Sequence, residues 1–116
     1  MNERKKEILK QLGGISETLY DTLVDEFIVQ AKKHMLDIET YISGNEIGEI
    51  GAVAHTLKGA AANLRLPAIE KAAAELEVRV KQAEERQGIA AVAGILKRSI
   101  GEAENHFHRL PKSGNG

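Results

Sequence analysis

Apolar residues recur at intervals of three and four along most of the chain, and no segment alternates with the period of two that marks a β-strand. The clearest stripe comprises Leu19, Leu23, Phe27, Ala31, Met35, Ile38 and Ile42. Only two prolines interrupt the 116 residues, and aromatic residues make up 3% of them, so Leu, Ile, Val and Ala must build the core. We therefore expect an all-α fold, an antiparallel up-down four-helix bundle with a short additional N-terminal helix.

Glycine, proline and capping residues indicate where the helices begin and end. Ser16 is a good N-cap, Gly13-Gly14 and Gly44 are typical helix stops, and Pro67 suits a first turn. We expect helices over residues 2–12, 16–44, 45–64, 67–88 and 89–110, the last four with about 18 or more residues each. Residues 1–110 are expected to form a single domain, followed by a flexible tail over 111–116.

Composition excludes several classes of function. The formal net charge of -1 provides no general attraction for nucleic acid. No run approaches the roughly 18 apolar residues of a membrane span, and the charged N-terminus is unlike a secretory signal. The absence of cysteine excludes disulfides and thiol catalysis and suits a cytoplasmic protein. Gly13-Gly14 lacks the Lys and Ser or Thr of a phosphate-binding loop, so we expect no ATP-dependent kinase activity.

The segment 45–64 contains the strongest functional candidate, His55. Its apolar residues fall in one sector of a helical wheel, and they are Ile47, Ile50, Ala54, Leu57, Ala61 and Leu64. His55 points roughly 140° away from the centre of that sector, toward solvent. We therefore expect an imidazole outside the core.

The residues that share the face of His55 are unusually small. They are Gly48, Gly51, Ala52, Lys58, Gly59 and Ala62, and all except Lys58 are glycine or alanine. Glycine inside a helix costs on the order of 1 kcal/mol relative to alanine, so an ordinary solvated face would carry longer polar residues. These glycines lie opposite the apolar stripe, which makes helix packing a poor explanation. The pattern favours a flat surface that another macromolecule can approach closely.

An exposed imidazole on such a surface is suited to nucleophilic chemistry. Imidazole titrates near neutrality, so a neutral ring nitrogen is available to attack a phosphoryl group. Lys58 stands one turn away and could neutralise an anion on His55. The simpler alternative is an ordinary solvated histidine, and these residues alone leave both open.

The segment from Ala54 to Leu64, AHTLKGAAANL, closely resembles the signature of histidine phosphotransfer (HPt) domains. The resemblance extends to the segment ending at Phe27, to Gly44-Asn45 and to Leu76-Glu77. It implies that His55 is phosphorylated, that Lys58 is the phosphate neighbour, and that Gly59 must stay open. The expected partner-docking residues are Gly48, Gly51, Ala52, Gly59, Ala62 and Arg65. Arg65 departs from the family, which commonly has glycine there, and could also be an ordinary solvated residue.

The resemblance also implies a function. HPt domains relay phosphoryl groups between receiver-domain aspartates or accept them from a sensor histidine kinase. The chain would be a phosphoryl carrier rather than a turnover enzyme, and a monomer, with no cofactor of its own because the receiver supplies Mg²⁺. The alternative is a helical interaction module that docks to receiver or kinase domains without being phosphorylated. A DNA-binding helix-turn-helix is disfavoured by the net charge of -1.

The other histidines offer no metal site. His34 stands alone, and His106 and His108 are separated by about 200° around a helix, so they cannot hold one ion from the same face. The chain also lacks the Glu-x-x-His pairs of di-iron bundles. We therefore expect no metal ligands.

Overall fold

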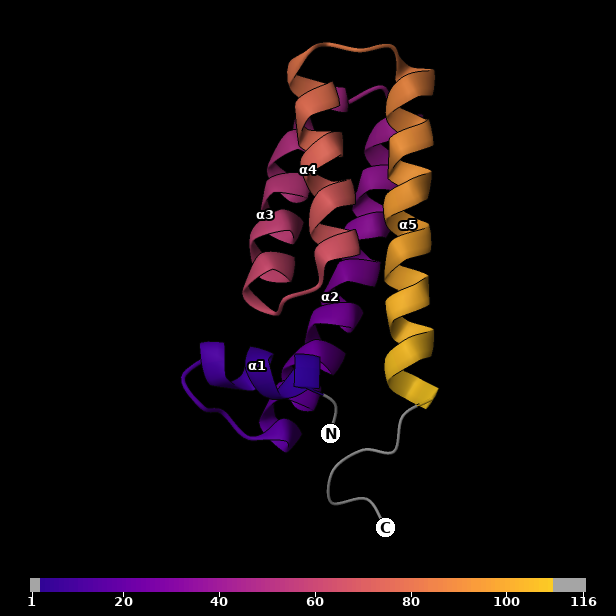
Figure 1. Ribbon diagram of the computed structural model, residues 1–116. Helices are drawn as coiled ribbons and strands as arrows, with labels where there is room; N and C mark the ends of the chain where they lie inside the picture. Colours follow the sequence, from indigo (N-terminus) through magenta and orange to yellow (C-terminus); the bar gives the residue numbers. More distant parts are fainter. Residues whose placement is uncertain (1–2, 110–116) are drawn as a thin grey trace.

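The computed structural model describes residues 3–109, and the side chains of residues 3–107. This part of the chain is all-α and contains no strand, as expected (Figure 1). Its elements are α1 (Glu3–Gln11), α2 (Glu17–Ser43), the 3₁₀ turn η1 (Ile47–Glu49), α3 (Ile50–Asn63), α4 (Pro67–Lys81) and α5 (Arg86–Arg109). The expected tail over 111–116, and Leu110 before it, lie outside the described residues.

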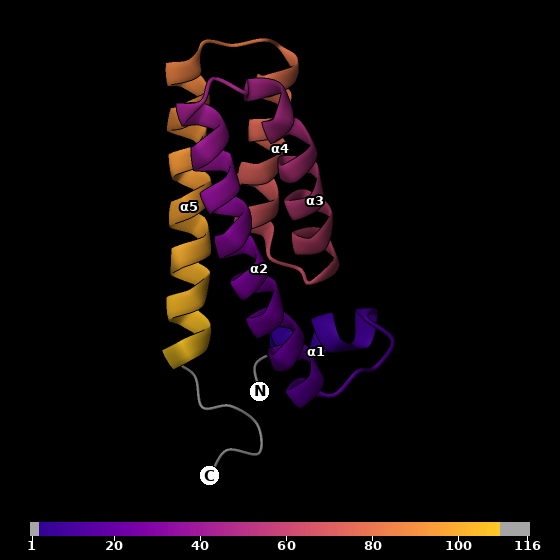
Figure 2. The same ribbon diagram turned by 180° about the vertical axis from the view of Figure 1, so that it is seen from behind.

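Helices α2, α3, α4 and α5 lie side by side and enclose the core (Figures 1 and 2). Helix α3 packs against α2 and α4, and α5 packs against α4 and α2, so the four contacts close a ring. The chain reverses direction at each short connection between them, as Figure 1 shows. Within residues 3–109, no helix combines the length and the apolar character needed to cross a bilayer.

The four helices of the bundle differ in length. α2 has 27 residues and α5 has 24, but α3 has 14 and α4 has 15, so the expectation of about 18 or more is wrong for α3 and α4. The long pair consequently extends past the connection between α3 and α4, and α1 lies beside α2 at that end (Figure 1). The Lys5 ammonium joins α1 to α2 through Glu17 and Asp21, at 3.0 and 2.8 Å.

Three helices are followed by a residue other than glycine in the left-handed conformation. Asn45, Arg65 and Ala83 have φ of 56°, 58° and 54°, and the backbone around each forms the pair of hydrogen bonds typical of a Schellman motif. The expected ends of α2 and α3 agree with the structure to within a residue, whereas the expected end of α4 is wrong. Helix α4 ends at Lys81 rather than near Gly88, which lies inside α5. The Ser16 N-cap is confirmed, since its Oγ accepts a hydrogen bond from the Leu19 N–H at 3.0 Å.

The core is aliphatic, as the composition predicts. In α3 the buried residues are Ile50, Ala54, Leu57 and Ala61, all members of the expected apolar sector. The start of α2 differs, because Tyr20 is buried while Leu19 is 46% exposed. The core face of α3 is thus fixed by four buried residues, and the opposite face of that helix is left to solvent.

Candidate functional site

His55 projects from the solvent face of α3. Its neighbours Ala54 and Leu57 are fully or almost fully buried, whereas 68% of the His55 side chain is exposed. The helix cannot rotate to hide the ring without exposing these residues, because burial of their apolar area stabilises the fold. The expectation of an imidazole outside the core is confirmed.

A carboxylate from a different helix holds this imidazole. The Oε2 of Glu77, on α4, lies 2.8 Å from Nδ1 of His55, and its Oε1 accepts a hydrogen bond from Lys58 Nζ at 2.6 Å. Lys81 Nζ is 3.8 Å from Oε2. Only 10% of the Glu77 side chain is exposed, so this carboxylate is almost buried beneath the imidazole. His55, Lys58 and Glu77 therefore form one hydrogen-bonded cluster.

The charge on Glu77 determines which ring nitrogen carries a proton. The hydrogen bond from Lys58 lowers the pKa of Glu77, the hydrogen bond with His55 also lowers it, and partial burial opposes both. Glu77 is therefore ionised near neutral pH and can only accept hydrogen bonds. In neutral His55, Nδ1 must then be the donor, and Nε2 keeps its lone pair. No hydrogen bond to Nε2 is formed by the residues that the structure describes.

Four of the expected docking residues lie on the same α3 surface as His55 or just before it. Gly48 and Gly59 are exposed, and a Cβ added at either would meet open space. Ala52 is exposed and Ala62 is half-buried. These positions leave the surface around the imidazole low, as the small residues predict.

The other two expected docking residues, Gly51 and Arg65, do not lie on the open surface around His55. Gly51 is half-buried, and a Cβ there would make ordinary contact with Val80 at 3.6 Å, so it borders α4. Arg65 lies beyond the end of α3, where its Nε donates to Gln11 of α1 at 3.1 Å. It is about 12 Å or more along the helix from His55. A docking role for these six residues stays a prediction.

Glu77 is not among the site residues that the sequence predicts. A signal was present, because Glu77 stands four residues after Ala73 and three before Val80, within the apolar stripe of α4. A carboxylate in a core stripe is rarely buried unless it is paired. The pattern marks Glu77 as unusual but does not identify its partner, which comes from another helix.

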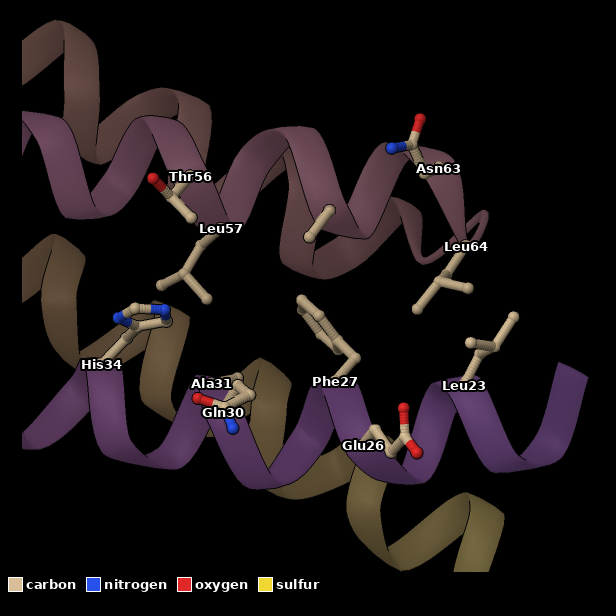
Figure 3. A pocket seen from close by; sticks show the side chains of 11 residues that line it. Leu23, Glu26, Phe27, Gln30, Ala31, His34, Thr56, Leu57, Asn63 and Leu64 are labelled. Atoms are coloured by element: carbon tan, nitrogen blue, oxygen red, sulfur yellow. The ribbon is translucent and has the colours of Figure 1, made fainter.

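A hollow of about 420 Å³ opens between α2 and α3, and Figure 3 shows Phe27 and Leu57 pointing toward the facing helix. His34 lines it, but His55, Lys58 and Glu77 do not, so this hollow is separate from the His55 cluster. Among the described side chains, no group of three His, Asp or Glu could hold a metal ion. The side chain of His108 lies outside that part of the chain.

The fold and the site together define a class of protein. It is a helical bundle that presents one histidine, hydrogen-bonded to a carboxylate, on an open surface. The Hpt domain family model matches residues 22–110, and the chain belongs to that family. Hpt domains act in phosphotransfer in two-component signalling, where they interact with receiver domains and kinases. No curated protein and no solved structure matches the chain.

Proposed function

We propose that this chain is a phosphorelay intermediate that accepts a phosphoryl group on His55 and passes it on. The donor is a receiver-domain aspartate or a sensor histidine kinase, and the acceptor is another receiver aspartate. The proposal includes a monomeric cytoplasmic protein whose α2 to α5 form an antiparallel up-down four-helix bundle. The observation that carries it is the 2.8 Å contact between Nδ1 of His55 and Glu77, which leaves Nε2 as the free nucleophile.

The proposed transfer step uses Nε2 directly. Its lone pair forms a bond to phosphorus while the P–O bond of the aspartyl phosphate breaks, and the electron pair of that bond leaves with the aspartate carboxylate. Nδ1 keeps its proton, so positive charge develops on the ring as the bond forms. The Glu77 carboxylate faces that charge and stabilises it, as a carboxylate does for any imidazole acting in this way.

Lys58 supplies positive charge beside the reacting nitrogen. Its ammonium lies against Glu77 at 2.6 Å and stands one helical turn from His55, within reach of a phosphoryl group on Nε2. Mg²⁺ and the acidic pocket belong to the receiver partner, and the low surface at Gly59 allows that partner to come close. The chain's own contribution is therefore an oriented nucleophile and one movable cation.

The test is transfer from a phosphorylated receiver domain to the purified chain. We expect an acid-labile, alkali-stable adduct on the wild type, none on His55→Gln, and an unchanged yield on the matched control His34→Gln, with circular dichroism confirming that all three are helical. Label that persists on His55→Gln would refute the assignment. A folded wild type that binds receivers but takes no label would favour a docking module instead.

A further inference from the structure

A second cavity, of about 310 Å³, lies where α1 meets the end of the bundle, remote from His55. Its apolar wall is formed by Ile8 of α1, Tyr20 of α2, Leu66 before α4, and Phe107 of α5. Four separate parts of the chain thus meet around one hollow. Cavities that bind small molecules begin at about this volume and are mostly apolar, with a few polar groups that fix orientation.

Apart from the Tyr20 hydroxyl, the polar side-chain groups of this cavity are all basic. Arg4, Lys5, Arg65 and His106 line it, and no aspartate or glutamate does, although the chain has 17 acidic and 16 basic residues. Lys5 is neutralised by the carboxylates of α2 described above. The uncompensated charge therefore comes from the two arginines.

Arg65 is engaged only by neutral groups. Its Nη1 donates to the carbonyls of Ala62 and Asn63 at 2.8 and 3.3 Å, and its Nε donates to the Gln11 side chain. A guanidinium has five N–H donors, and its Nη2 makes no hydrogen bond within the described residues. Arg4 is exposed and forms no ion pair with any described side chain. Both guanidinium groups are therefore available to an anion.

The tyrosine in the cavity wall responds to these charges. Burial raises the pKa of the Tyr20 hydroxyl and Asp21 also raises it, whereas Lys5, Arg4 and Arg65 lower it. Because Arg4 and Arg65 line the same hollow as Leu66 and Phe107, an anion held by the arginines would place an attached apolar group in that hollow.

We propose that this cavity is a binding site for a small organic anion with a compact apolar body. The anionic group lies between Arg4 and Arg65, whose planar donors suit phosphate and carboxylate oxygens. The apolar body lies against Leu66 and Phe107. This site is independent of phosphotransfer at His55, and it gives Arg65 a role that the reactive surface does not.

Phenyl phosphate is a suitable probe, because phenol and inorganic phosphate are its two halves. Each is titrated into the ¹⁵N-labelled chain while amide chemical shifts are recorded. We expect saturable shifts centred on Ile8, Tyr20 and Phe107, with a dissociation constant in the millimolar range or tighter for a ligand of this size. Each half should bind about tenfold more weakly or worse.

Single-residue variants distinguish a loss of ligand affinity from a loss of folding. Arg65→Gly relieves a φ of +58°, so it should fold at least as well as the wild type while losing about tenfold or more in affinity. Arg4→Gln should weaken binding likewise, whereas Arg98→Gln, which removes an exposed arginine of α5 away from the cavity, should not. Melting temperatures check folding in each case.

Four results would overturn the proposal. They are the absence of saturable shifts, shifts centred on another surface, equal losses in Arg65→Gly and Arg98→Gln, and binding of either half as tightly as phenyl phosphate. The last would mean an adventitious anion or a purely apolar contact. None of these results bears on labelling of His55, so the two proposals fail separately.

Discussion

Replacing Glu77 by glutamine tests the reactive site most directly, because it keeps the shape of the side chain and removes its charge. The carboxylate lies 2.8 Å from Nδ1 and faces the positive charge that develops on the ring during phosphorylation. A charge-assisted hydrogen bond is roughly twice as strong as a neutral one. Losing that difference in the transition state corresponds to about a tenfold slower reaction. The glutamine also removes the negative charge that is paired with Lys58, although its amide oxygen can still accept a hydrogen bond.

The assay is phosphorylation by phosphoramidate, a small donor that requires no docking, followed by ³¹P nuclear magnetic resonance. Wild-type protein should give only the isomer phosphorylated on Nε2 of His55, because Glu77 occupies Nδ1. Glu77→Gln should react about tenfold more slowly and give a mixture of both isomers. The reasoning is refuted if the wild type carries its phosphoryl group on Nδ1, or if the variant keeps both the rate and the isomer.

Four further predictions concern the surroundings of His55. Gly59→Ala should raise the free energy of unfolding by about 0.5–1 kcal/mol in urea titrations, because the added Cβ meets open space. Gly59→Glu should slow transfer from a phosphorylated receiver while leaving phosphoramidate labelling unchanged. Equal effects on both reactions would contradict a docking role for Gly59. Lys58→Ala should make the phosphorylated protein decay several-fold faster and should lower the melting temperature, since Glu77 loses its 2.6 Å partner; a stable adduct would exclude Lys58 as the phosphate neighbour. Folding lowers the pKa of Glu77, so its carboxylate stabilises the fold fully above the ordinary glutamate pKa of about 4.3, and this stabilisation is lost as the pH falls through the lower pKa of the folded state. Over that acidic range, the melting temperature of Glu77→Gln should therefore fall less steeply with pH than that of the wild type.

The apolar periodicity predicts the buried face of α3 correctly, because that information is local. In α3 it identified Ala54 and Leu57 as core residues and therefore His55 as exposed, and all three assignments are confirmed. At the start of α2 it favoured Leu19, whereas Tyr20 is the buried residue. The hydroxyl of Tyr20 bonds the Leu64 carbonyl, a contact that depends on the neighbouring α3 and α4.

The end of α4 is not predicted by the sequence, because glycine is the usual signal for a helix end and none stands there. Ala83 adopts a left-handed conformation and ends α4, although its side chain gives no signal of this. Gly88 is not a stop; it leaves room beside α5 for the Glu84 side chain, which accepts a hydrogen bond from Arg79 at 2.6 Å. At Arg65 the φ of +58° gives a physical reason for glycine at this position in the family.

The chemistry of the site was predicted only in part. His55 and Lys58 are three residues apart on one helix, so their proximity follows from sequence spacing. Glu77 is brought to them by the packing of α3 against α4. Spacing along the sequence does not predict which residues of the two helices come to lie opposite each other. The sequence therefore predicts that His55 reacts, and the structure identifies the carboxylate that is hydrogen-bonded to it.

The imidazole and its carboxylate belong to different helices, and this makes the choice between the two ring nitrogens a property of the assembled bundle. A chain whose α3 and α4 have separated still carries His55, but neither nitrogen is then masked and the isomer selectivity disappears. In a urea titration, selectivity for Nε2 should therefore vanish together with the far-ultraviolet helical signal. The isomer ratio of the phosphorylated protein would then report the fraction of molecules in which α3 and α4 are packed together.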